Sequence, residues 1–281
     1  MKNLFCIILL ATSFFACGKR TDNQSDKIIS VSIPPLKSIV EAIVGDDFEI
    51  ETLLPSGVAP ESYSPTISQL LNLENSEFLF TTGLLDFEHQ IFNNLHLPSE
   101  RIINLSNSID IITDSTHIHK NTPAPDPHIW LSPLRLKTIA SNVYNAIHSR
   151  FPDSAKYQHA YLKLIDRIDS THLAVLETVN NSPQHMFIIY HPALSYFAKD
   201  YNLVQLAVEN NGKEPSALHI QNIVSTASDN NIKVVLYQSE FPQSVVEVIA
   251  ADIGAVTVEF NPLNENILDE ILNISHIICD L

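Results

Sequence analysis

The sequence has 281 residues, of which 16 are Lys or Arg and 32 are Asp or Glu, so the formal net charge is −16. This acidic balance, with no basic run, excludes nucleic acid as a partner, because a phosphate backbone is bound mainly through Lys and Arg. The six glycines are too scattered for a phosphate-binding loop or a serine-hydrolase nucleophile elbow. A length of 281 residues suits two folded domains, and 45% hydrophobic residues are enough to form their cores.

The N-terminal residues 1–16 predict a secretory signal peptide. Lys2 precedes a mostly apolar run, 4–16, which is shorter than the about 20 residues that a membrane-spanning helix needs. The run ends in Phe14-Phe15-Ala16-Cys17, which resembles the cleavage box of bacterial lipoproteins, so we expect Cys17 to carry the lipid. An ordinary signal peptide with an incidental Cys is the alternative. Residues 17–27 are polar and predict a flexible tether on an extracytoplasmic, lipid-anchored protein of a bacterial membrane.

From residue 28 onward, short β-rich runs alternate with helical patterns, which is typical of an α/β sheet with parallel strands. In the first half we predict strands at 28–33, 48–54, 78–82 and 101–105 and helices at 36–44, 67–75, 87–95 and 133–150. In the second half we predict strands at 186–190, 204–208, 233–238 and 256–260 and helices at 193–201, 217–230, 243–253 and 267–278.

Between the two halves, residues 153–182 contain neither Pro nor Gly, and apolar residues recur there at spacings of three, four or seven. This pattern predicts one long amphipathic helix, bracketed by Pro152 and Pro183, of about 40 Å at 1.5 Å per residue. Two shorter helices with a kink are the alternative. The predicted fold is therefore α/β, with an N-terminal lobe at 28–152 and a C-terminal lobe at 183–281 joined by this helix. Each lobe has a four-stranded, mainly parallel sheet flanked by helices.

Polar residues at the ends of predicted strands form a candidate site, because a parallel sheet binds ligands beyond the carboxyl ends of its strands. His191 directly follows the first strand of the second lobe, and His128 precedes the last helix of the first lobe. Glu61 lies in the loop after the second strand, while Glu240 and Asn261 follow the seventh and eighth strands. Imidazoles and carboxylates from different strand ends suit a zinc ion, with Glu240, Asn261 or water as the fourth ligand.

Several segments also resemble the signatures of one family. They are Pro60-Glu61-Ser62-Tyr63-Ser64-Pro65-Thr66 (P-H-x-Y-x-P-T), Thr82-Gly83-Leu84 with Glu88 (G-x-x-x-x-E), residues 126–133 (D-P-H-x-W-L-x-P), Tyr190-His191-Pro192-Ala193 with Tyr196-Phe197-Ala198, Glu214-Pro215-Ser216 (E-P-S) and Asn261-Pro262-Leu263 (D-P-L). On these motifs residues 28–281 resemble the cluster A-I solute-binding proteins of ABC transporters for zinc and manganese, the zinc-uptake and TroA-like family. The resemblance implies two lobes joined by a rigid helix, with one metal ion held between them and passed to a membrane permease.

The sequence departs from the family at three positions. Glu61 stands where many members have a His ligand, and Asn261 stands where many have an Asp. The usual E-P-Q-F segment reads Gln238-Ser239-Glu240-Phe241, so the carboxylate has moved two positions. Glu61 and two neutral His residues would leave a net charge of about plus one around a divalent ion. Glu240 would neutralise that charge.

The His-x-His pair, one helix carboxylate and the single Trp also have predicted roles. His117 and His119 form a His-x-His pair in the stretch 114–127, which either gathers zinc or is an uninvolved solvent loop. Glu88 either orients the hinge region or is an exposed helix carboxylate. Trp130 is expected to pack where the lobes close.

We therefore predict a monomeric, non-enzymatic zinc-binding protein of an ABC importer that binds one divalent cation and docks on a permease. Manganese is the alternative ion, because Glu61 and Asn261 offer oxygen donors. A zinc-dependent hydrolase, with Glu61 or Glu240 as general base, and a metal-binding surface adhesin are the alternative functions. Because imidazole must be neutral to bind a metal, affinity should fall as the pH drops through about 6 to 7.

Overall fold

The computed structural model describes residues 27–92, 97–119, 122–209, 213–241 and 243–280, and the side chains of 114–123 are not described. The predicted signal peptide and Cys17 lie outside these ranges. Among the described helices, none combines the length and the apolar composition that crossing a membrane would require.

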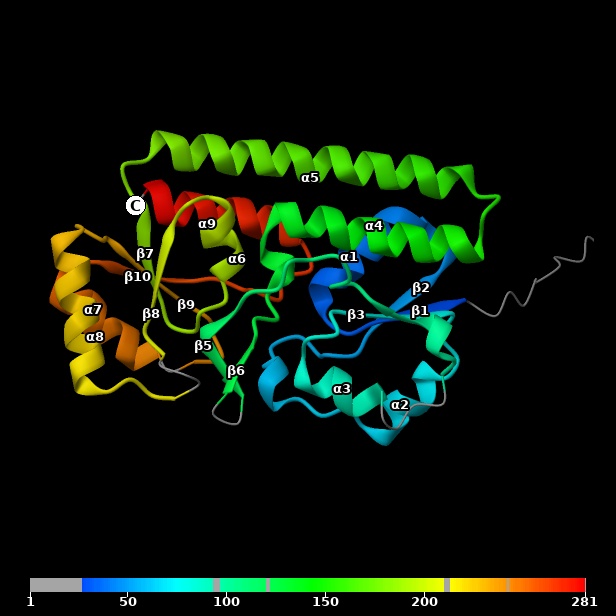
Figure 1. Ribbon diagram of the computed structural model, residues 1–281, viewed down its shortest axis with the longest axis horizontal. Coiled ribbons are helices and arrows are strands. Elements are labelled where there is room, and N and C mark those ends of the chain that lie inside the picture. The colour runs from blue at the N-terminus through cyan, green and yellow to red at the C-terminus, as the bar shows by residue number, and fades with distance from the viewer. Residues whose placement is uncertain (1–26, 93–96, 120–121, 210–212, 242, 281) are drawn as a thin grey trace, which may run out of the picture.

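The first lobe is a four-stranded parallel sheet in the order β2-β1-β3-β4 with helices around it (Figure 1). Its strands are β1 (Ile28–Val31), β2 (Glu49–Thr52), β3 (Phe78–Thr81) and β4 (Ile102–Asn104). Its helices are α1 (Pro34–Val44), α2 (Ile67–Leu73), α3 (Asp86–Phe92) and α4 (Pro133–Arg150), with short 3₁₀ turns η1 (Gly45–Asp47), η2 (Pro60–Ser62), η3 (Ser99–Arg101) and η4 (Ile129–Leu131). Every strand predicted for this half is present.

The second lobe repeats this arrangement with a parallel sheet in the order β10-β9-β7-β8. Its strands are β7 (Met186–Ile189), β8 (Val204–Ala207), β9 (Val234–Tyr237) and β10 (Val256–Glu259). Its helices are α6 (Ser195–Asp200), α7 (Ala217–Asp229), α8 (Gln243–Ile253) and α9 (Ile267–Asp280). In both lobes the first strand is central, the second pairs on one side of it and the third on the other. β7 and β8 therefore occupy the same positions in the second sheet as β1 and β2 do in the first.

The long helix α5 (Ala155–Asn181) is one unbroken helix of 27 residues, so the alternative of two kinked helices is wrong. It spans both lobes along one side of the molecule (Figure 1) and packs on α1, α4 and α9. Its buried residues, Tyr157, Leu164, Ile168, Val175 and Val179, are those of the predicted stripe, and they join a hydrophobic core that reaches from the first lobe into the second. A smaller core lies between the second sheet and α7 and α8. The fold class is confirmed, and the boundaries of the lobes stay predictions.

The sequence analysis missed a hairpin between the lobes. Strands β5 (Thr113–His119) and β6 (Thr122–Pro125) pair antiparallel in the stretch that was predicted as a loop (Figure 1). The register shifts between Asp114 and Ile118, and two prolines, Pro123 and Pro125, lie in β6. Prolines weaken a strand signal because they cannot donate a ladder hydrogen bond, so the pattern of this segment was typical of a loop.

Candidate metal centre

Glu61 is held at the mouth of the site by a loop with its own hydrogen bonds. The residue lies in η2, which begins with Pro60 after β2, and its side chain is 51% exposed. The Tyr63 hydroxyl and the Gln69 amide both donate to the carbonyl oxygen of Leu53, at 2.7 and 3.0 Å. Gln69 also forms a capping box with Thr66 at the start of α2. The loop is thus anchored on both sides of Glu61, while the carboxylate itself reaches toward the second lobe.

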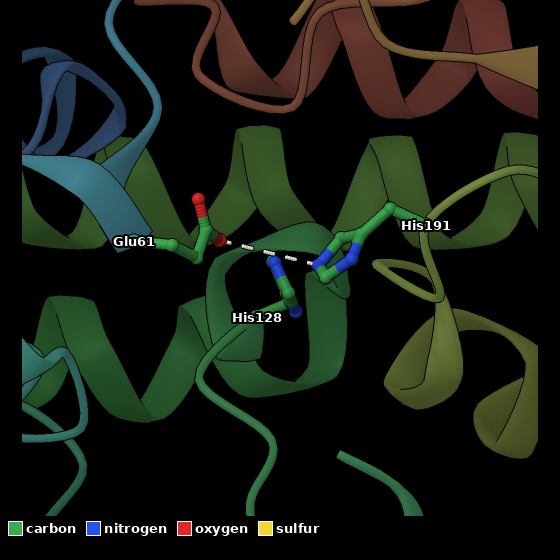
Figure 2. Close-up of side chains that lie close together, drawn as sticks. All are labelled: Glu61, His128 and His191. Atoms are coloured by element: carbon green, nitrogen blue, oxygen red, sulfur yellow. Dashed lines mark ion pairs between the residues drawn. The ribbon is translucent and has the colours of Figure 1, made fainter. Parts of the chain in front are cut away.

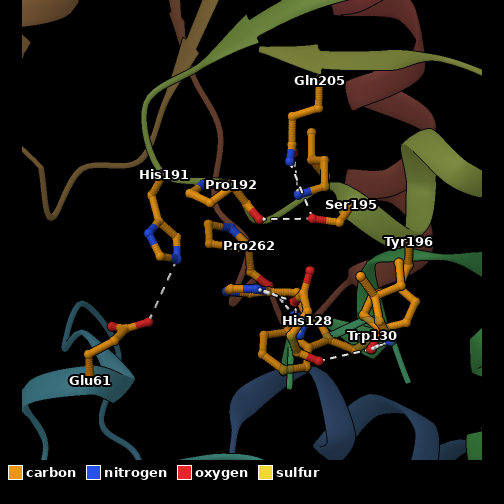
Figure 3. A network of polar contacts seen from close by, with 12 residues as sticks. Glu61, His128, Trp130, His191, Pro192, Ser195, Tyr196, Gln205 and Pro262 are labelled. Atoms are coloured by element: carbon orange, nitrogen blue, oxygen red, sulfur yellow. Dashed lines mark hydrogen bonds and ion pairs between the residues drawn. The ribbon is translucent and has the colours of Figure 1, made fainter. Parts of the chain in front are cut away.

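His128 is placed by Asp126 and by contacts that cross between the lobes. The Asp126 carboxylate accepts hydrogen bonds from the His128 backbone N–H, at 2.9 Å, and from its Nδ1, at 2.8 Å. Both residues are buried. From the second lobe, the Tyr196 hydroxyl donates to the Asp126 carbonyl oxygen at 2.9 Å (Figure 3). Trp130 is fully buried, and its Nε1 donates to the Pro262 carbonyl oxygen at 2.7 Å. It therefore packs where the two lobes meet, as expected.

His191 comes from the second lobe and is placed in a similar way. It follows Tyr190 at the end of β7, and its Nδ1 contacts Glu209 Oε2 at 2.7 Å. Its ring stacks on Phe241, with ring centroids 5.1 Å apart and an interplanar angle of 14°. The Gln238 amide donates to the His191 carbonyl oxygen at 3.1 Å. The ring is therefore fixed by a carboxylate at one edge and an aromatic face beside it.

Glu61, His128 and His191 converge between the lobes (Figure 2). One ligand atom from each lies within 4.8 Å of the other two, and in the described residues this is the cluster of His, Cys, Asp and Glu groups that could hold a metal ion. His191 Nε2 is 4.0 Å from Glu61 Oε1, and the two imidazole centroids are 5.3 Å apart. A hydrogen bond from each Nδ1 to a carboxylate assigns the proton to that nitrogen and points to Nε2 as the atom that could bind a metal. The donor set therefore fits a divalent cation.

The charges around His191 favour its protonated form when no metal is bound. Burial alone lowers the pKa of the imidazole. The hydrogen bond to Glu209 and the negative charges of Glu209, Glu61 and Asp126 outweigh burial, so the pKa of His191 lies above its ordinary value. The same negative charges would stabilise a bound cation. Proton and metal therefore compete for one nitrogen.

The structure does not bring the other two predicted ligands into the cluster. Glu240 is half-buried and lines the same small cavity as Glu61, His128 and His191, but it is not part of the 4.8 Å group. The side-chain oxygen of Asn261 accepts a hydrogen bond from the Leu263 backbone N–H at 2.9 Å. As ligands, both residues stay predictions.

Two of the residues that hold the site were not assigned a role from the sequence. Asp126 was noted only as part of a motif, and Glu209 was not noted. Both carboxylates orient an imidazole of the candidate site through its Nδ1, and such outer groups contribute to metal affinity in proteins generally. A usable signal existed for Glu209, because it follows β8 as His191 follows β7, and these neighbouring strands end at the same edge. His117 and His119 lie in β5, but their side chains are outside the described set, so their role stays a prediction.

Two parallel α/β lobes, a long helix that joins them and a candidate cation site between them are typical of a solute-binding protein of the rigid-helix class. The sequence profile of the zinc-uptake complex component A family, described as periplasmic, matches residues 29–272. The chain belongs to this family, which confirms the resemblance found in the motifs.

Individual relatives agree with the family match. The high-affinity zinc uptake system protein ZnuA of Bacillus subtilis strain 168 is 25% identical over an alignment of 277 positions, which covers 92% of this chain and 86% of that protein. The zinc-binding lipoprotein AdcA of Streptococcus pneumoniae R6 is 21% identical over an alignment of 285 positions, which covers 96% of this chain but only 57% of that protein. Among solved structures, a zinc-bound ZnuA with residues 138–173 deleted superposes with a TM-score of 0.80 at 29% identity, covering 90% of this chain and 98% of that one.

Proposed function

We propose that this chain is an extracytoplasmic solute-binding protein that binds one zinc ion and delivers it to the permease of an ABC importer. The observation that carries the proposal is the convergence of Glu61, His128 and His191 from two lobes, with donor atoms within 4.8 Å of one another. The family match supports a role in zinc uptake. An interlobe site suits transport, because a docked permease can move one ligand, on a surface loop, away from the others.

The donor set favours zinc over manganese. Two imidazoles and one carboxylate are ligands that zinc binds well, whereas manganese prefers more oxygen donors. The relatives named above are described as zinc-binding or as part of a zinc uptake system, which supports the same ion here. Elemental analysis of protein purified without added metal tests the choice, and a manganese content above that of zinc would reject it.

Ion release should involve a local change in the loops. The two lobes are linked by α5 and by hydrogen bonds such as those from Trp130 to Pro262 and from Arg135 to Asp200, at 2.7 and 2.9 Å. These contacts oppose a large hinge motion. Glu61 is the exposed member of the ligand set and lies in a surface loop, so its loop is the natural place for the rearrangement.

Isothermal titration of zinc into the His128→Ala/His191→Ala double variant tests the site. We expect one ion per wild-type chain and no saturable binding by the variant, because a single carboxylate cannot hold zinc tightly. The matched control is His148→Ala/His159→Ala, which removes two exposed imidazoles on α4 and α5. If the first double variant keeps the stoichiometry and affinity of the wild type, the proposed site is wrong.

The role of Glu61 is tested by a pair of substitutions. Glu61→Ala should weaken zinc binding, because it removes the ligand and its charge. Glu61→His, which restores the residue that the family motif usually has, should keep tight binding. Unchanged affinity in Glu61→Ala would show that the carboxylate is not a ligand and that water or another residue completes the site.

The proposed location is extracytoplasmic, on the periplasmic side of a bacterial membrane or at the cell surface, with the lipid on Cys17 and the mature chain as a monomer. The periplasmic family supports an extracytoplasmic site. Metabolic labelling with palmitate tests the anchor: wild type and Cys279→Ser should incorporate label and Cys17→Ser should not. Equal labelling of wild type and Cys17→Ser would refute it.

The two rival functions have less support. Membership of a transport family disfavours a zinc-dependent hydrolase, and a screen of ester and phosphoester turnover by zinc-loaded protein would reveal one. A surface adhesin would bind host matrix without metal, so matrix binding by the His128→Ala/His191→Ala variant separates that function from transport.

A further inference from the structure

Two buried oxygens near the candidate ligands lack hydrogen-bond donors. Gln238 Oε1 and Glu240 Oε2 accept no hydrogen bond within the described part of the chain. Gln238 is only 1% exposed. Both residues follow β9 and line the small cavity that Glu61, His128 and His191 also line.

The orientation of the Gln238 amide follows from its other contact. Its Nε2 donates to the carbonyl oxygen of His191 at 3.1 Å, and a carbonyl oxygen can only accept a hydrogen bond. The amide group therefore cannot be flipped, and Oε1 is turned away from that carbonyl. The carbonyl group of His191, a candidate ligand, thus fixes the direction in which Gln238 Oε1 points.

Leaving such oxygens without a donor is unfavourable. A buried, unsatisfied acceptor costs about 1–3 kcal/mol, and more if it is charged. A ligand that satisfies both must therefore supply two donors at once. The cavity has a volume of about 20 Å³, which is enough for one water molecule.

A water molecule bound to the ion meets both requirements. Its oxygen binds the metal, and its two O–H groups point away and can donate to two acceptors. Glu240 lies outside the group whose donor atoms are all within 4.8 Å of one another, so its carboxylate does not complete that group as a direct ligand. If the ion bound either oxygen directly, the other would still lack a donor.

We propose that Gln238 and Glu240 are positioning residues that hold a water molecule in the fourth coordination position of the ion, each through its unsatisfied oxygen. This inference rests on the proposed metal site. It gives Gln238, a position where the family motif has Glu, a part in ion binding. It also gives Glu240 a role other than direct ligation.

Cobalt(II) is a suitable probe, because its visible spectrum reports ligand exchange in a zinc site. We expect wild-type protein to bind one cobalt ion and to respond to thiocyanate with a saturable spectral change, because the anion replaces the water. The larger cleft of about 790 Å³, which shares Glu61, His128, His191 and Glu240 with the small cavity, leaves room for the anion. Glu240→Gln should bind thiocyanate about tenfold more tightly, because a like charge beside the anion is removed.

Gln238→Leu should weaken cobalt binding by about 10- to 100-fold, the range for outer groups of metal sites, and still show the thiocyanate response. The control variants are Glu247→Gln and Gln221→Leu, which change exposed residues of α8 and α7 and should behave as the wild type. The proposal is overturned if cobalt-loaded wild type does not respond to thiocyanate, if Glu240→Gln has wild-type anion affinity, or if Glu240→Gln loses the ion. A wild-type chain that binds no cobalt overturns the metal site itself, so the two failures are distinguishable.

Discussion

Glu209 should contribute to metal affinity without touching the ion. Its carboxylate accepts the hydrogen bond from His191 Nδ1 at 2.7 Å, and its side chain is only 9% exposed. Its own backbone N–H donates to the Tyr190 carbonyl oxygen at 2.9 Å, which fixes the residue beside β7. Glu209→Gln keeps the size and a hydrogen-bond acceptor but removes the charge. The substitution therefore isolates the electrostatic part of the contact.

We expect Glu209→Gln to bind zinc about 10- to 100-fold more weakly than wild type at neutral or higher pH, the range seen for such outer carboxylates. This corresponds to about 1.4–2.8 kcal/mol, since each tenfold change is 1.4 kcal/mol. The physical reason is that a charged acceptor makes the imidazole a better electron donor and attracts the cation.

The pH dependence of the same variant has a definite sign. Burial lowers the pKa of His191, but Glu209 raises it through the hydrogen bond and its charge, and the pKa lies above the ordinary value. Protons therefore compete with zinc in the wild type already at mildly acidic pH. Removing the Glu209 charge lowers the pKa of His191, so the variant loses less affinity on acidification. The affinity ratio of wild type to variant should narrow from pH 8 to about pH 6.

Competition with a chromophoric chelator at pH 6, 7 and 8 measures this ratio. Glu247→Gln, an exposed carboxylate on α8, is the matched control and should equal wild type at each pH. An affinity of Glu209→Gln within twofold of wild type at pH 8, or a ratio that widens on acidification, would refute the reasoning.

Three other predictions concern stability. Trp130→Phe removes the hydrogen bond to the buried Pro262 carbonyl oxygen and should lower the free energy of unfolding by about 1–3 kcal/mol, measured by urea denaturation; a change below 0.5 kcal/mol would contradict the interlobe role. Glu88→Gln places an amide donor against backbone N–H groups and should cost about 2–3 kcal/mol in the same assay, whereas a neutral effect would show that the buried carboxylate is dispensable. Asp47→Asn should cost at most about 1 kcal/mol at neutral pH, because the ion pair with Lys156 is largely exposed. The hydrogen bond from Lys156 lowers the pKa of Asp47, so the difference should be present above pH 4 and vanish as the pH falls through the folded pKa; melting curves that differ equally at pH 7 and pH 3 would contradict this.

The sequence predicted the two sheets well because both are strongly patterned. Parallel strands buried on both faces, such as β3 and β7, read as short apolar runs between helical segments. The helix α5 was predicted because its apolar stripe continues without a breaker for its whole length. The hairpin of β5 and β6 was missed because its strands carry prolines and polar residues and pair only with each other.

The candidate ligands were only partly predictable. His191 could be placed at the end of a strand and His128 in the loop before the last helix of the first lobe, because strand ends determine where loops meet. That Glu61 reaches both of them depends on how the lobes face each other, which no local pattern encodes. The role of Asn261 could not be predicted either. Its side-chain oxygen accepts a hydrogen bond from the Leu263 backbone N–H in the same turn, and only the structure shows this contact.

Glu88 shows most clearly what tertiary structure alone decided. As one acidic residue on a short helix, it could orient the hinge region or be exposed to solvent. In the structure it is fully buried and accepts hydrogen bonds from Thr82, Leu84 and Leu85, so it orders the loop after β3 and the exposed alternative is wrong. The sequence by itself determined the alternation of strands and helices and the residue types at their ends, because these depend on local periodicity. The burial of charges and the meeting of ligands from different lobes depend on contacts between residues far apart in the chain, and only the packed fold defines those contacts.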